Sequence, residues 1–107
     1  MERCNKEFFK MTRLIQVDTG LNYRIWILSQ GNKKNHLSRI KVEINKQLIP
    51  VSISKDPIIL LRKKITIPNF DKLKKFIILN YDVLIDYWNS KGDMSLREVF
   101  RRLKKVK

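Results

Sequence analysis

The sequence predicts an α+β domain in which an antiparallel sheet of four or five strands packs on a long helix and a short basic helix follows. Two observations support this fold class. Apolar and polar residues alternate through the first half of the chain, and near residue 69 the apolar spacing changes to that of an amphipathic helix. The 107 residues suit one domain. We expect an N-terminal extension over residues 1–11 and the domain over residues 12–107, with either Met1 or Met11 as the translation start.

Five segments of the first part are strand candidates. Residues 12–18 (TRLIQVD) come first, and residues 22–30 (NYRIWILSQ) are apolar on both faces, which is typical of a central strand. Residues 37–45 (LSRIKVEIN) alternate, so that one face is apolar and the other, with Arg39 and Lys41, is largely basic. Residues 47–54 (QLIPVSIS) follow a tight turn at Lys46 and Gln47, and Pro50 indicates an edge strand because it cannot donate a backbone hydrogen bond. Residues 58–67 are the fifth candidate.

Two helices complete the predicted fold. Asn69 can cap a helix that runs to a stop at Lys91 and Gly92. The apolar stripe of this helix consists of Phe70, Leu73, Phe76, Ile77, Tyr81, Leu84, Ile85 and Trp88. Ser95 and Glu98 have the spacing of a capping box, which predicts a last helix to about Val106.

The order of these elements resembles a family of small, uncharacterised bacterial proteins known only as a domain of unknown function. The matching segments are YRIWILSQ, RIKVEI and FIILNYDVLIDYWN, the last with the pattern LN-x-x-x-L-x-x-x-W, and together they span about residues 23–89. The resemblance implies a fold and a neighbourhood of mobile elements and toxin–antitoxin pairs, but no activity. The family's polar turn is rich in histidine, whereas GNKKNHLSRIKV keeps one histidine, His36.

The charge of the chain is its most unusual property. The 24 basic and 10 acidic residues give a net charge of +14, which favours association with polyanions. Nucleic acid and an acidic protein are the two candidate partners, and the bias of an AT-rich genome is a third explanation. The single cysteine, Cys4, excludes an internal disulfide, and no apolar run exceeds four residues. We therefore expect a cytoplasmic protein without a membrane span; the sequence does not indicate its oligomeric state.

Four basic clusters are the candidate nucleic-acid-binding sites. They lie in the polar turn, on the alternating strand, in the LRKKI segment and in the last helix. Their members are Lys33, Lys34, Arg39, Lys41, Arg62, Lys63, Lys64, Arg97, Arg101, Arg102, Lys104 and Lys105. Arginine suits bidentate contacts to phosphate, and lysine supplies a flexible charge.

The candidates for other chemistry are fewer. His36 would need further ligands to hold a metal, and none has a recognisable spacing, so we expect no metal, cofactor or catalytic residue. We expect Trp26, Tyr81 and Trp88 in the core, with Tyr23 and Tyr87 as the aromatic residues nearest to solvent.

Three functions are compatible with these observations. The first is a non-enzymatic module that binds RNA or single strands through backbone phosphates. The second is a protein-interaction module, such as a phage or mobile-element inhibitor or a toxin–antitoxin component, that docks on an acidic partner. The third is a small ribonuclease toxin with His36 as general base beside Lys34, Arg39 and Tyr23.

Overall fold

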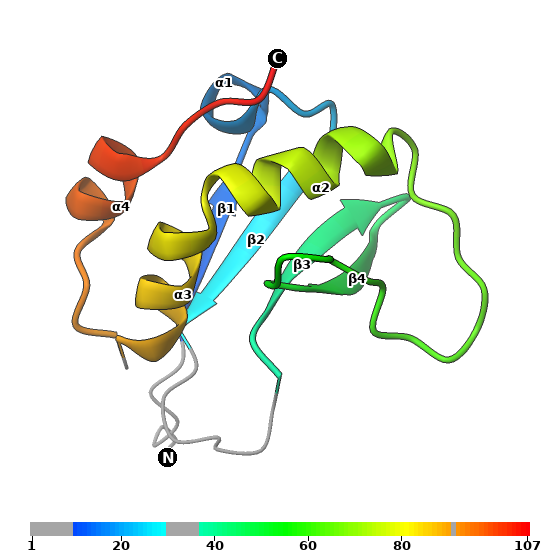
Figure 1. Ribbon diagram of the computed structural model, residues 1–107, viewed down its shortest axis with the longest axis horizontal. Helices are drawn as coiled ribbons and strands as arrows, with labels where there is room; N and C mark the ends of the chain where they lie inside the picture. The colour runs from blue at the N-terminus through cyan, green and yellow to red at the C-terminus, as the bar shows by residue number, and fades with distance from the viewer. Residues whose placement is uncertain (1–9, 30–36, 91) are drawn as a thin grey trace.

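The helices of this chain gather on one face of an antiparallel sheet (Figure 1). The structure is a computed structural model and describes residues 10–29, 37–90 and 92–107. Within them, four strands pair in chain order: β1 (Lys10–Leu14), β2 (Arg24–Ser29), β3 (Arg39–Ile44) and β4 (Gln47–Ser52). The helices are α1 (Gln16–Thr19), α2 (Phe70–Leu79), α3 (Tyr81–Asn89) and α4 (Leu96–Arg102). The predicted α+β class and antiparallel sheet are confirmed.

The helix-facing side of the sheet carries the core. Cross-strand register places Ile25 between Leu14 and Val42, and all three side chains are fully buried. On the same face, Thr12 Oγ1 lies 3.3 Å from the phenolic oxygen of Tyr87 in α3. The alternation in the sequence therefore identifies the buried face of these strands correctly.

A two-residue turn joins β3 to β4. Ile44 pairs with Gln47, so the turn residues are Asn45 and Lys46, with φ of 50° and 69°. Positive φ at both central positions is typical of a type I′ hairpin, and asparagine adopts it more readily than most residues. The predicted tight turn is present, but its placement at Lys46 and Gln47 is wrong by one residue.

The first strand is shifted relative to its prediction. It begins at Lys10, and residues 16–18 of the predicted strand lie in α1. Asp18 causes the change, because its carboxylate accepts a hydrogen bond from the Ile15 N–H at 3.0 Å. Gly20 then closes the turn with φ of 84°.

Residues 58–67 do not form the predicted fifth strand. Ile59 makes one bridge to Val51, supported by a hydrogen bond from the Ser52 N–H to the Ile58 carbonyl at 2.9 Å. The chain then leaves the sheet, and Arg62 and the two lysines after it are exposed. In the described part of the chain, β4 is therefore an edge strand of the sheet, as is β1 on the other side.

The predicted long helix is divided at Asn80 into α2 and α3. Asn80 is buried, and its side-chain amide donates to the carbonyls of Phe76 at 3.0 Å and Lys104 at 2.8 Å. Its side-chain oxygen accepts from the Lys104 N–H at 2.7 Å. The break turns Val83 and Tyr87 into the core beside most of the predicted stripe. At the other end of α2, Asn69 occupies the predicted cap position without a side-chain cap hydrogen bond.

The last helix begins as predicted and ends early. Ser95 Oγ accepts a hydrogen bond from the Glu98 N–H at 3.1 Å, but α4 stops at Arg102 and does not reach Val106. Residues 103–107, called the C-terminal strap below, cross the helix layer towards α1 (Figure 1). The strap leaves the helix because the Val106 side chain is buried and its N–H donates to the Thr19 carbonyl at 2.9 Å. None of the described helices is long and apolar enough to cross a membrane.

Candidate nucleic-acid interface

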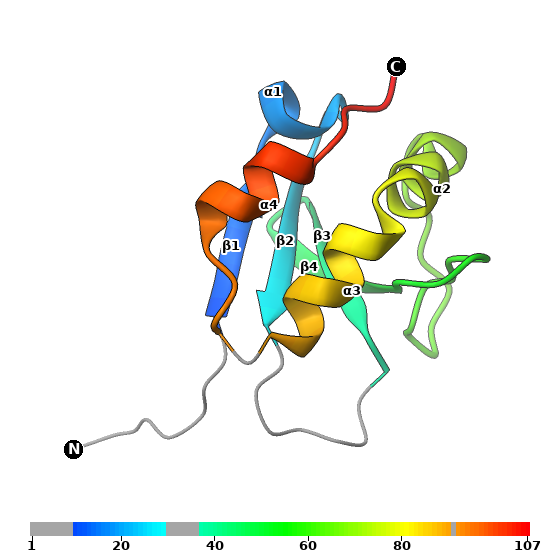
Figure 2. The ribbon, with the colours of Figure 1, turned by 60° about the vertical axis from the view of Figure 1, so that its left-hand side comes forward.

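The second face of the sheet has no described helix over it (Figure 2). Strand side chains alternate between faces, so the residues next to the core positions point to this side. We call it the open face. It carries Met11 and Arg13 of β1, Arg24, Trp26 and Leu28 of β2, Arg39, Lys41 and Glu43 of β3, and Leu48, Pro50 and Ser52 of β4.

A row of three side chains crosses the centre of the open face. The register pairs Trp26 with Arg13 on one side and with Lys41 on the other. Neighbouring strands are about 4.8 Å apart, so the two cations leave the backbone about 10 Å from each other with the indole between them. Trp26 is half-buried and Arg13 is exposed. The row therefore places an aromatic ring between two positive charges.

One carboxylate organises the neighbouring side chains. Glu43 accepts a hydrogen bond from Trp26 Nε1 at 3.0 Å and lies 3.5 Å from Arg24 Nη1. The Glu43 side chain is 23% exposed and that of Arg24 is 53% exposed, so the pair is partly accessible to solvent. Arg39 Nε donates to the Leu37 carbonyl at 3.0 Å, which holds its guanidinium at the start of β3. On the described open face, four cations thus accompany one carboxylate.

Among the described residues, the three predicted basic clusters other than the polar turn do not form one surface. Arg39 and Lys41 lie on the open face. The LRKKI cluster of Arg62, Lys63 and Lys64 is exposed in the loop after β4, and α4 lies on the helix side, at the opposite end of the sheet (Figures 1 and 2). Lys33, Lys34 and His36 lie outside the described residues, so predictions about them stay predictions.

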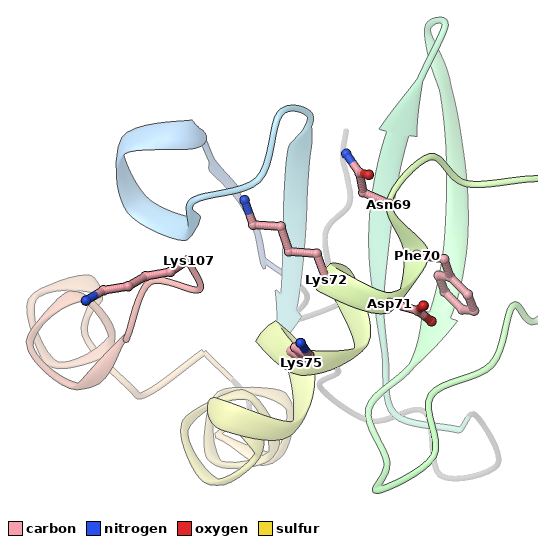
Figure 3. A pocket seen from close by; sticks show the side chains of 6 residues that line it. All are labelled: Asn69, Phe70, Asp71, Lys72, Lys75 and Lys107. Carbon is pink, nitrogen blue, oxygen red and sulfur yellow. The ribbon is translucent and has the colours of Figure 1, made fainter.

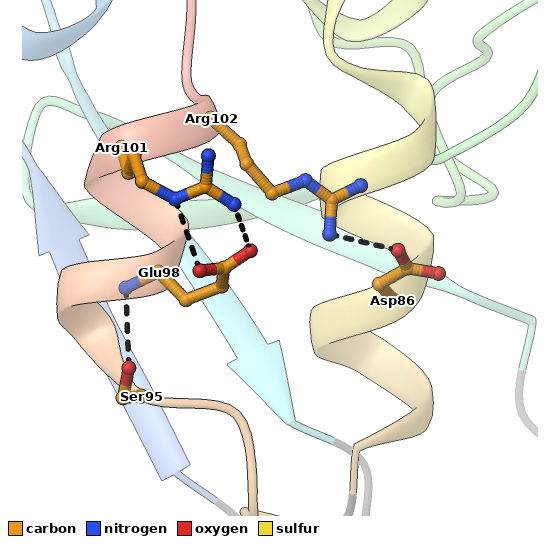
Figure 4. A network of polar contacts seen from close by, with 5 residues as sticks. All are labelled: Asp86, Ser95, Glu98, Arg101 and Arg102. Carbon is orange, nitrogen blue, oxygen red and sulfur yellow. Dashed lines mark hydrogen bonds and ion pairs between the residues drawn. The ribbon is translucent and has the colours of Figure 1, made fainter.

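Part of the basic charge of α4 is already paired (Figure 4). Arg101 Nε donates to a carboxylate oxygen of Glu98 at 3.1 Å, and Arg102 lies 2.9 Å from Asp86 of α3. The hydrogen bond from Arg101 lowers the pKa of Glu98 and raises that of Arg101 itself. Arg97, Lys104 and Lys105 are exposed on this side. Because two of its arginines are paired, α4 offers less free charge than its sequence indicates.

The structure corrects the predicted positions of the aromatic residues. Tyr87 is 1% exposed, whereas it was expected near solvent, and Trp26 lies on the open face and not in the core. Tyr23 is half-buried, and its hydroxyl donates to the Pro68 carbonyl at 2.8 Å. Burial raises the pKa of Tyr23 to about 12.

Two shallow pockets lie away from the open face. One, of about 490 Å³, is lined by Asn69, Phe70, Asp71, Lys72, Lys75 and Lys107, and its lysine side chains point in different directions (Figure 3). The other, of about 320 Å³, lies between α3 and α4 and is lined by Leu79, Asn80, Asp82, Val83, Arg101, Arg102 and Lys104. Among the described residues, no three histidine, cysteine or acidic side chains are grouped to hold a metal.

Comparisons of the chain with protein-family models, with curated proteins and with solved structures find no match. The resemblance to the bacterial domain of unknown function, and the toxin–antitoxin or mobile-element setting that it implies, therefore stay predictions.

Proposed function

We propose that this protein binds nucleic acid, as RNA or single strands, through phosphate contacts on the open face of the sheet. One observation supports the proposal above the others. Three neighbouring strands place Arg13, Arg24, Arg39 and Lys41 on one face, over which no described helix lies. In this proposal the protein is a binding module without catalytic activity.

The physical basis is the release of counterions from the nucleic acid. Each neutralised phosphate of a single strand contributes about −0.7 to the slope of log K against log salt. Because Arg24 already faces Glu43, three contacts on the open face, from Arg13, Arg39 and Lys41, would give a slope of about −2. Arginine also binds two phosphate oxygens at once. These contacts fix the nucleic-acid strand on the sheet without reading its base sequence.

A pair of matched variants separates contacts on this face from the effect of total charge. Arg39→Gln with Lys41→Gln removes two charges from the open face, and Lys63→Gln with Lys64→Gln removes two from the loop after β4. Affinity for a labelled single-stranded oligonucleotide is measured by fluorescence anisotropy over a range of salt concentrations. We expect the open-face variant to lower the slope by about 1.4, because two phosphate contacts are lost, and the loop variant to change it much less.

Two outcomes contradict the proposal. If both variants lose affinity equally, the attraction depends on total charge and not on the open face. If the unmodified protein binds no nucleic acid at low salt, the proposed function is wrong.

Docking on an acidic protein is the second candidate, because Leu48 is 41% exposed on the same face as the cations. Exposed apolar and aromatic groups beside arginine are common at protein interfaces. A pull-down from the native host, with and without nuclease, distinguishes the candidates. A stoichiometric protein that stays bound after nuclease treatment favours the protein partner.

A further inference from the structure

We infer that Trp26 is a stacking platform for an unpaired base, so that the open face selects single strands over duplexes. The inference rests on the proposed function and adds to it the form of the nucleic acid and the group that recognises it. Trp26 occupies the centre of the open face, between Arg13 and Lys41 in the cross-strand register.

The position of Trp26 differs from that of a core tryptophan. Trp88, the other tryptophan, is 6% exposed within the helix layer. Trp26 is half-buried on a face with charged neighbours. A large aromatic side chain in such a setting is typical of a binding surface.

The ring is also held in place before any ligand arrives. Its Nε1 donates to Glu43 Oε1 at 3.0 Å, and Arg24 lies 3.5 Å from the other carboxylate oxygen. Because both partners extend from paired strands, the indole has a fixed anchor on the sheet. A pre-oriented ring loses less side-chain entropy when a base stacks on it.

The Trp26 ring accounts for the preference for a single strand, and the neighbouring cations contribute the phosphate contacts. Arg13 and Lys41 flank the ring. A single nucleic-acid strand that crosses the sheet can therefore place a base on Trp26 and its phosphates near the two cations. In a duplex the bases are already stacked on each other and their faces are not accessible to the ring. Stacking on an aromatic residue is sequence-tolerant, because every base has a π-face.

The test compares Trp26→Leu and Trp26→Phe with the unmodified protein. Affinity is measured for a single-stranded oligonucleotide and for the duplex of the same sequence, at one salt concentration. We expect Trp26→Leu to weaken single-strand binding by about 5- to 150-fold and to leave duplex binding nearly unchanged. Trp26→Phe should retain most of the affinity, because it keeps an aromatic face. Thermal unfolding of each variant verifies that it is folded.

Tryptophan fluorescence provides a measurement that does not depend on the leucine variant. Stacking should quench the emission of the unmodified protein on addition of a single strand, and Trp26→Phe, which leaves Trp88 as the remaining tryptophan, should lose the quenching. Equal loss of single-strand and duplex affinity in Trp26→Leu, or quenching that persists in Trp26→Phe, overturns the inference.

The two proposals fail in different ways. If the protein binds with the expected salt slope and responds to Arg39→Gln with Lys41→Gln, but single-strand affinity does not change in Trp26→Leu, only the stacking role is wrong. If neither nucleic acid binds, the proposed function itself is wrong.

Discussion

Replacing Asn80 by alanine should weaken the fold more than any exposed substitution. The change removes three hydrogen bonds, which join the side chain to Phe76 and Lys104. At about 1 kcal/mol each, their loss costs about 3 kcal/mol. We therefore expect the free energy of unfolding to fall by about 2–3 kcal/mol, a large part of the ~5–15 kcal/mol of a typical domain.

Equilibrium unfolding in urea measures this loss. For a domain of this size, with m of about 1–3 kcal/mol/M, the midpoint should fall by roughly 0.7–3 M with little change in slope. Asn89→Ala, at the exposed end of α3, is the control and should stay within about 0.5 kcal/mol of the unmodified protein. Amide exchange should also accelerate at Lys104 and Val106, because the strap is released. If Asn80→Ala is as stable as Asn89→Ala, the hydrogen bonds to the strap contribute nothing and the reasoning is refuted.

Two further predictions concern Gly20 and Tyr23, which lie in the segment between α1 and β2. Gly20→Ala should destabilise the fold by at least about 1–2 kcal/mol, because alanine disfavours a φ of 84° and its Cβ would lie 2.0 Å from the Val106 carbonyl oxygen; an unchanged thermal midpoint would contradict this. Tyr23 has a pKa of about 12 in the fold against an ordinary 10.0, so the fold favours its neutral form. The resulting stability is complete below pH 10.0 and is lost as the pH rises towards about 12. Urea unfolding across that range should show a steeper fall for the unmodified protein than for Tyr23→Phe, and parallel curves would refute the assignment.

The sequence predicts well those parts of the fold that depend on residues close together in the chain. Alternation through residues 39–44 identifies β3 and its buried face, and the Ser95 hydroxyl marks the start of α4. The break at Asn80 is different, because its hydrogen-bond partner Lys104 is distant in the chain and only the folded structure brings the two together. The extended strap is missed for the same reason. Residues 103–107 mix apolar and basic side chains, which fits a helix equally well, and their contact with Thr19 is distant in the chain.

The candidate interface is only partly visible in the sequence. Arg39 and Lys41 are predicted because their strand alternates cleanly. Arg13 is missed because the first predicted strand gave no buried face. Arg24 and Trp26 are missed, because β2 is apolar at positions on both faces and nothing local indicates which face the helices cover. Cross-strand register supplies that information by pairing Trp26 with Lys41. In β3 the basic residues alternate with the apolar ones. Pairing this strand with β2 would have placed Trp26 on the same face as those basic residues.

The strap has a consequence for how the chain folds as it is synthesised. Each strand pairs with the next one along the chain, so the sheet can form while later residues are still being translated. The contact between Val106 and Thr19 instead joins opposite ends of the domain. At ~5–20 residues per second, translation from Asn80 to Val106 takes roughly 1–5 s. During those seconds the buried amide of Asn80 has no strap to bind, so the helix layer can close only after the last residues of the domain have been synthesised.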